Sequence, residues 1–136
     1  MNNFSKLAIA GAVFAFASIA AQAQTMRVSI PFKFHAGTEI LPAGNYQVKI
    51  ELQSRHVSIT GLDNKAGCLL NYKTGLSGKE LAKGHLVFNA YGSAYFLHRV
   101  EPRASDGVEL FTSRAEREMA RVNAAPEVST VSEGLE

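Results

Sequence analysis

Short stretches in which every second residue is apolar constrain this chain more than any other feature of its sequence. In residues 26–34 the alternating apolar side chains are Val28, Ile30, Phe32 and Phe34, and residues 46–52 repeat the pattern. This alternation is typical of a strand with one face in a core. Pro31 lacks an N–H group, so the first strand is predicted to lie at a sheet edge or to contain a bulge.

The register of the following strands can be predicted by counting residues outward from each hairpin turn. A short loop after Leu52 pairs that residue with Val57 and pairs Ile50 with Ile59. The next turn pairs Gly61 with Cys68. All apolar residues then share one face, which predicts a three-stranded antiparallel meander. The single cysteine, which has no internal disulfide partner, is predicted to lie on the core face.

Residues 85–100 are predicted to form a second hairpin. Gly92 and Ser93 suit a type II′ turn, and this register places Phe88 opposite Leu97. Residues 73–84 are expected to form a surface loop, and residues 108–111 one more short strand. The predicted class is therefore all-β, an antiparallel sandwich or partly open barrel of about seven strands.

The C-terminal region has a different pattern. Ser113 and Glu116 form a capping box, which predicts a helix over residues 113–124 that ends before Pro126. Ala115, Met119 and Val122 form an apolar stripe that we expect to pack this helix on or beside the β domain of residues 24–112, with a partner site on the basic helix as the alternative. Residues 125–136 lack aromatic side chains and periodicity and are expected to be disordered.

The N-terminus has the organisation of a signal peptide. A charged Lys6 precedes an apolar run over residues 7–20, and Ala-Gln-Ala at residues 21–23 suits a signal peptidase. We expect cleavage after Ala23, with an uncleaved anchor as the alternative. No membrane span is then expected in the mature chain, and the destination would be the periplasm or the medium.

Charge argues against nucleic acid as a partner. Without residues 1–23 the chain keeps 13 basic and 12 acidic side chains, and they are interspersed. Nucleic-acid and polybasic membrane contacts need clustered positive charge. No motif indicates a cofactor, and the oligomeric state is left open.

Two histidines form the one constellation that suggests chemistry. The hairpin register places His85 and His98 as diagonal neighbours on one face, at a separation of roughly 7–8 Å. Such a pair could bind zinc or copper if His56 or Asp63 supplied a third ligand. Without a further convergent polar cluster, the absence of enzymatic activity is the favoured expectation.

Three segments together resemble a known group of proteins. They read "IPFKFHAGTEILPAGNYQV", "GHLVFNAYGSAYFLHRV" and "SRAEREMAR", and they span most of residues 28–121. In order and spacing they resemble a group of small, exported, uncharacterised bacterial proteins. The resemblance implies export and a compact β-rich fold with a basic C-terminal helix. It implies no activity and therefore no functional residue.

Three functions remain as hypotheses. The first is an exported, non-catalytic β module of the cell envelope or medium that binds a partner or assists surface assembly. The second is a carrier of a small apolar ligand, with a cavity lined by Phe32, Phe34, Phe88, Tyr95 and Phe96. The third is a metal-dependent activity at the His85 and His98 site.

Overall fold

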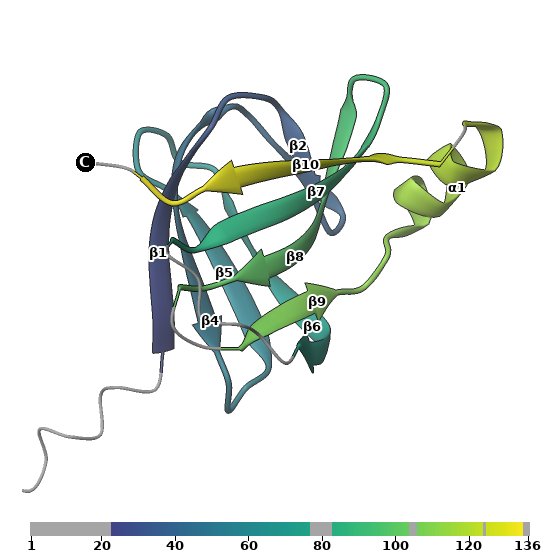
Figure 1. The fold of residues 1–136 in the computed structure, drawn as a ribbon. Coiled ribbons are helices and arrows are strands. Elements are labelled where there is room, and N and C mark those ends of the chain that lie inside the picture. Colours follow the sequence, from purple (N-terminus) through teal and green to yellow (C-terminus); the bar gives the residue numbers. More distant parts are fainter. Residues whose placement is uncertain (1–22, 77–82, 104–105, 124, 135–136) are drawn as a thin grey trace, which may run out of the picture.

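The computed structural model describes residues 23–76, 83–103, 106–123 and 125–134, which form ten strands and one helix. The strands are β1 (Ala23–Ile30), β2 (Phe34–Ala36), β3 (Glu39–Leu41), β4 (Gly44–Glu51), β5 (His56–Gly61), β6 (Gly67–Leu76), β7 (His85–Tyr91), β8 (Ala94–Glu101), β9 (Gly107–Leu110) and β10 (Glu127–Ser132), and the helix is α1 (Arg114–Val122). Figure 1 shows their arrangement. The predicted mainly β class with one C-terminal helix is confirmed.

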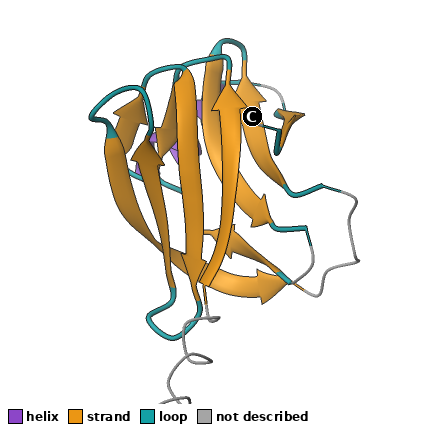
Figure 2. Cartoon of the chain, turned by 90° about the vertical axis from the view of Figure 1, so that its left-hand side faces the viewer, coloured by secondary structure: helices purple, strands orange, loops and turns teal. Residues whose placement is uncertain are grey.

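The strands form one strongly bent sheet. Its order is β1-β4-β5-β6-β9-β8, and β8 continues to β7 and β10 on one side and to β2 and β3 on the other. The strands β7, β8 and β9 lie in front of β4, β5 and β6 in Figure 1, and Figure 2 shows the helix behind the strands. The sheet is not closed into a barrel, because β1 and β10 meet only at a bridge between Val28 and Glu133.

The core fills the space between the two parts of this bent sheet. Its fully buried side chains come from strands of both parts, and the largest of them are Tyr46, Phe34, Phe88, Ile30, Ile50 and Ile59. Tyr46 also donates a hydrogen bond from its hydroxyl to the carbonyl of Pro42. That bond fastens the turn at residues 42–43, which leads from β3 into β4.

Pro31 separates two strands that the sequence pattern joins. β1 ends at Ile30, and β2 begins at Phe34 and pairs with β3 and β8 instead of β4. A proline cannot donate to the ladder, so the chain leaves the β1–β4 pair at this residue. The expectation of one continuous strand over residues 26–34 is therefore wrong.

The predicted meander is present as β4, β5 and β6, with a register two residues from the predicted one. Ile50 pairs with Val57, and Ile59 pairs with Cys68. The shift arises because Arg55 adopts a positive φ of 59° and closes a turn that already begins at Leu52. Side chains alternate with a period of two, so a two-residue shift leaves every apolar residue on the predicted face.

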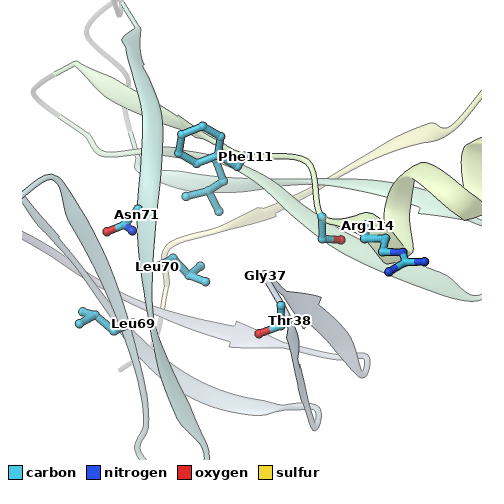
Figure 3. A pocket seen from close by; sticks show the side chains of 9 residues that line it. Gly37, Thr38, Leu69, Leu70, Asn71, Phe111 and Arg114 are labelled. Atoms are coloured by element: carbon cyan, nitrogen blue, oxygen red, sulfur yellow. The ribbon is translucent and has the colours of Figure 1, made fainter.

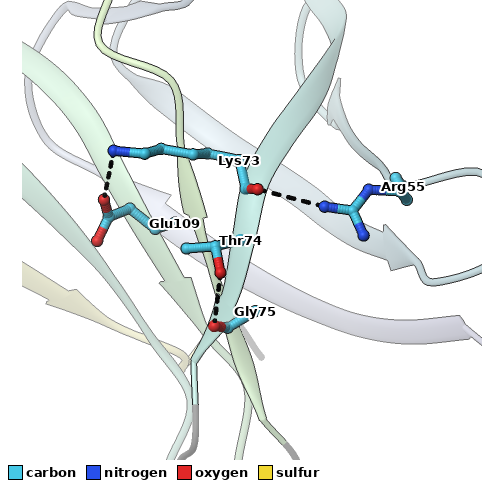
Figure 4. A network of polar contacts seen from close by, with 5 residues as sticks. All are labelled: Arg55, Lys73, Thr74, Gly75 and Glu109. Atoms are coloured by element: carbon cyan, nitrogen blue, oxygen red, sulfur yellow. Dashed lines mark hydrogen bonds and ion pairs between the residues drawn. The ribbon is translucent and has the colours of Figure 1, made fainter.

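β6 is longer than expected and occupies part of the predicted loop. A register shift between Tyr72 and Thr74 lets residues 74–76 pair with β9. Around this bulge Arg55 donates a hydrogen bond to the Lys73 carbonyl (3.2 Å), and the Lys73 ammonium lies 3.6 Å from the Glu109 carboxylate (Figure 4). The remainder of the predicted loop, residues 77–82, lies outside the described residues, as do residues 1–22 of the predicted signal peptide.

The second hairpin keeps its predicted register only near its turn. Phe88 lies opposite Leu97, and Gly92 has a φ of 65°, as a type II′ turn requires. A bulge between Val87 and Phe88 then moves the remaining pairs by one residue. His85 consequently lies opposite Glu101 instead of Val100.

The C-terminal segment forms a strand where disorder was expected. β10 pairs along its whole length with β7, from Glu127 opposite Ala90 to Ser132 opposite His85. Valine, threonine and serine dominate its sequence, and the first two are strong strand formers. The absence of aromatic residues was therefore a poor guide, because an edge strand needs only main-chain partners and little buried surface.

Candidate functional site: a groove beside the helix

Three adjoining hollows follow one another along a single side of the molecule. The first lies between α1 and β8 and has a volume of about 450 Å³; the second, of about 360 Å³, lies between α1 and the β2–β3 hairpin; the third, of about 290 Å³, lies between that hairpin, β6 and the end of β9. His35 lines the first two, and Gly37 and Arg114 line the last two. We call these three hollows together the helix groove.

A buried carboxylate holds α1 in place. The helix begins after Ser113, whose hydroxyl accepts a hydrogen bond from the Glu116 N–H (3.1 Å), as the capping box predicts. The Glu116 side chain does not reach back to the cap. Its Oε2 atom instead accepts hydrogen bonds from Asn89 Nδ2 and the Tyr91 hydroxyl, each at 3.0 Å. The pKa of Tyr91 is raised, mainly by burial and to a smaller extent by the hydrogen bond of its hydroxyl to Glu116 and by the Glu116 charge.

This polar anchor leaves the apolar stripe of α1 uncovered. Ala115 and Val122 are exposed, Val122 to 80%, and Met119 is half-buried. The prediction that the stripe docks the helix on the β domain is therefore wrong. All three residues instead line the first hollow, opposite Ala94 and Phe96.

Aromatic rings form the floor of the groove near α1. His35 stacks on Phe96 with ring centroids 4.2 Å apart and an interplanar angle of 21°. Burial, and then the positive charge of Lys33, lower the pKa of His35 below its usual value of 6.5. The imidazole is therefore neutral at neutral pH, and the floor is a flat surface without charge.

The far end of the groove lies at the edge of β6. Figure 3 shows Leu70 pointing toward Gly37, with Leu69 and Asn71 on the opposite side of the strand. Gly37 has a φ of 63°, and a Cβ atom there would come within 2.6 Å of Leu70 Cδ2. Glycine adopts this φ without strain, and it leaves room for the Leu70 side chain where the hairpin approaches β6. Arg114 is the charged side chain at this end.

Exposed hydrophobic side chains concentrate along the groove. The large hydrophobic side chains that are exposed among the described residues are Ile40, Leu52, Leu62, Leu69, Phe111, Val122 and Val128. Four of these seven are residues of the three hollows, namely Ile40, Leu69, Phe111 and Val122, and the Leu69 side chain lies on the side of β6 away from Gly37. Single exposed apolar residues are ordinary, whereas a grouping of them around a hollow marks an interaction site.

The predicted histidine pair loses its geometric basis. The bulge removes the register that made His85 and His98 diagonal neighbours. His85 Nε2 lies 2.6 Å from Glu101 Oε1, so the imidazole is engaged in an ion pair or hydrogen bond. Among the described residues, no group of three or more His, Cys, Asp or Glu side chains is placed to hold a metal ion.

The aromatic residues expected to line a ligand cavity pack on one another. Phe32 stacks on Tyr95 at a centroid distance of 3.8 Å and meets Phe88 edge-on at 5.0 Å. Phe34 meets Phe88 edge-on at 5.6 Å. These contacts are ordinary core packing. Of the five residues named for the cavity, Phe96 alone lines the helix groove.

Cys68 packs against the core but is only partly covered. Burial, and to a smaller extent the charge of Glu39, raise the pKa of its thiol to about 11. A thiol with this pKa is almost wholly protonated at neutral pH and is a poor nucleophile.

Comparison with known proteins gives no relative. No protein-family model matches the chain, and no curated protein or solved structure matches it significantly. Within the described residues, no helix has the length and apolar character needed to cross a membrane.

The sequence contained a partial signal for the groove. Ala115, Met119 and Val122 were recognised as a stripe, but their exposure depends on Glu116, which the pattern assigned to the cap. The sequence pattern did not indicate that Leu69 and Phe111 are exposed, because it does not show at which residue the pairing between two strands ends. β9 ends at Leu110, which leaves Phe111 exposed beside β6.

Proposed function

We propose that this protein is an exported, non-catalytic binding module, and that the helix groove takes an apolar segment of a partner protein. The observation that carries the proposal is the grouping of the exposed side chains of Ile40, Phe111 and Val122 around three connected hollows. Burying such side chains contributes roughly 25 cal/mol per Å² of apolar surface removed from water. A polypeptide segment suits an elongated groove that is open to solvent along its length.

The chemistry of the lining supports binding and offers little for catalysis. The first hollow is mainly apolar, and its one charged side chain, Glu118, lies 3.4 Å from Arg114 on the same helix. The neutral His35 ring stacks on Phe96 and contributes a flat contact surface. Export rests on the signal-peptide pattern and on the group of exported bacterial proteins that the chain resembles.

A small apolar ligand is the second candidate. The hollow between α1 and β8 has a volume of about 450 Å³, within the range of small-molecule sites. A native mass spectrum separates the two candidates. A small mass lost on denaturation would favour the ligand carrier, and a polypeptide of defined mass would favour the partner module.

Photo-crosslinking from chosen positions tests the proposal. A benzophenone amino acid is placed at Phe111 or Val122 in the groove and, as a matched control, at Leu52 or Leu62, which are exposed away from it. We expect the groove positions to yield one discrete crosslinked polypeptide, identified by mass spectrometry, which then binds the purified protein. Equal crosslinking from the control positions, or none from the groove, would contradict the proposal.

A further inference from the structure

His35 lies where an occupant of the helix groove would cover it. The residue lines both the hollow between α1 and β8 and the hollow between α1 and the β2–β3 hairpin. Its ring stacks on Phe96 with a centroid distance of 4.2 Å, so one face of the imidazole already contacts protein. Histidine is the side chain whose charge ordinarily changes near neutral pH. The groove therefore contains a group that mild acid can charge.

The strands on either side of His35 bring no charge to it. On β8, Phe96 and an alanine line the same hollow. On β3, Ile40 is the direct partner of His35 in the ladder. Glu39 pairs with Ala36, the next position, so its side chain lies on the other face of the hairpin. The sheet side of the groove is therefore apolar around the imidazole.

The helix and the segment before β2 supply the charges that face His35. Glu118 lines both hollows with it, and Glu118 Oε1 lies 3.4 Å from Arg114 Nε, so these two opposite charges compensate each other. Burial, and then the positive charge of Lys33, two residues earlier in the chain, lower the pKa of His35. The surroundings therefore favour the neutral imidazole over the charged one.

We propose that mild acid releases the occupant of the helix groove by placing a positive charge on His35. This inference rests on the proposed function, because it concerns the same groove and the same apolar occupant. An apolar segment that covers the imidazole removes water from it. A charged ring taken out of water without a partner costs far more free energy than a neutral ring. The occupied groove therefore excludes the protonated form.

Thermodynamic linkage fixes the direction of the effect. An occupant that binds the neutral ring more tightly must lower the pKa of His35 further when it binds. Its affinity is then constant well above the pKa of the free protein, which lies below 6.5, and falls by up to about ten-fold for each pH unit below that pKa. A protein outside the cytoplasm, as proposed above, experiences the pH of its surroundings, so acid alone would release the partner.

Binding of an uncharged apolar dye at two pH values tests the proposal. The probe is Nile red, whose fluorescence rises in apolar surroundings and whose charge does not change in this range. The unmodified protein is titrated at about pH 7.5 and about pH 5, and we expect a dissociation constant at least about three-fold higher at the lower pH. Equal dissociation constants at the two pH values would overturn the proposal.

Two histidine variants locate the effect. His35→Phe and His98→Phe both replace an imidazole by a ring that cannot be charged, but His98 lines none of the three hollows. We expect the ratio of the two dissociation constants to fall to about one in His35→Phe and to stay unchanged in His98→Phe. A ratio that His35→Phe leaves unchanged, or that both variants abolish, would overturn the proposal.

A titration of the unmodified protein gives the same test without a variant. The ring protons of His35 are followed by NMR as the pH is lowered, with and without saturating Nile red. We expect the dye to lower the pKa of His35, because the occupied groove excludes the charged ring. A pKa that the dye leaves unchanged would overturn the proposal.

Failure of the groove itself gives a different result. Val122→Ser alters the hollow between α1 and β8 and should weaken dye binding at both pH values. No dye binding at neutral pH, or binding that Val122→Ser leaves unchanged, would contradict the proposed function and this inference together. Dye binding in the groove that persists undiminished in acid would contradict this inference alone.

Discussion

The β4–β5 part of the sheet and the α1 side of the molecule use apolar residues in opposite ways. In β4 and β5 every second side chain is buried, and Val48, Ile50, Val57 and Ile59 are at most 1% exposed. Beside α1, Ile40, Phe111 and Val122 are more than half exposed around the helix groove. The first part supplies stability, and the second leaves apolar surface available to a partner.

Replacing a core residue tests this division with the largest expected effect. Ile59→Ala removes a side chain that is 1% exposed and should lower the free energy of unfolding by about 2–5 kcal/mol. Leu69→Ala removes one that is 63% exposed and should change it by less than about 0.5 kcal/mol. Urea unfolding of both variants provides the measurement. Similar losses would show that Leu69 belongs to the core.

The two parts also differ in how far the sequence predicts them. The faces of β4, β5 and β6 follow from period-two alternation, and they remain correct although the register of Ile50 and Ile59 is shifted by two. The helix also follows, because its cap at Ser113 is a local hydrogen bond.

The helix groove cannot be predicted from the sequence pattern, because it depends on contacts between residues that are far apart in the sequence. Glu116 is anchored by Asn89 and Tyr91, more than twenty positions earlier in the chain. The bulge beside Val87, which breaks the register assumed for the predicted histidine pair, is likewise not predicted by a regular strand pattern. Local patterns therefore predicted the strands β4, β5 and β6 with their faces, and the helix, but neither β10 nor the places where apolar surface stays uncovered.

Removing the Glu116 carboxylate that holds α1 should have an intermediate effect on the free energy of unfolding. Glu116→Ala leaves Asn89 and the buried Tyr91 hydroxyl without their acceptor and should cost about 1–3 kcal/mol. Glu118→Ala, on the same helix, breaks only an exposed ion pair with Arg114 and should cost less than about 0.5 kcal/mol. Hydrogen exchange of the α1 amides should accelerate in the first variant alone. Unchanged protection there would mean that other contacts hold the helix.

Acid should produce the smallest effect, confined to the groove. His35 has a pKa below 6.5 in the folded protein, so the unfolded chain binds the proton more readily. Stability is therefore fully present above about pH 6.5 and declines as the pH falls toward the lowered pKa. His35→Phe should flatten this part of the stability profile, measured by thermal unfolding between neutral and mildly acidic pH. An unchanged profile would exclude His35 as its cause.

The most direct test of the account compares two matched double variants for binding and stability. Phe111→Ser with Val122→Ser alters the helix groove, and Leu52→Ser with Leu62→Ser removes large hydrophobic side chains that are also exposed, but lie elsewhere. Binding of the crosslinked partner polypeptide is measured by calorimetry together with urea unfolding. The account predicts near-unchanged stability for both variants and loss of binding only in the groove variant. Undiminished binding by the groove variant would contradict it.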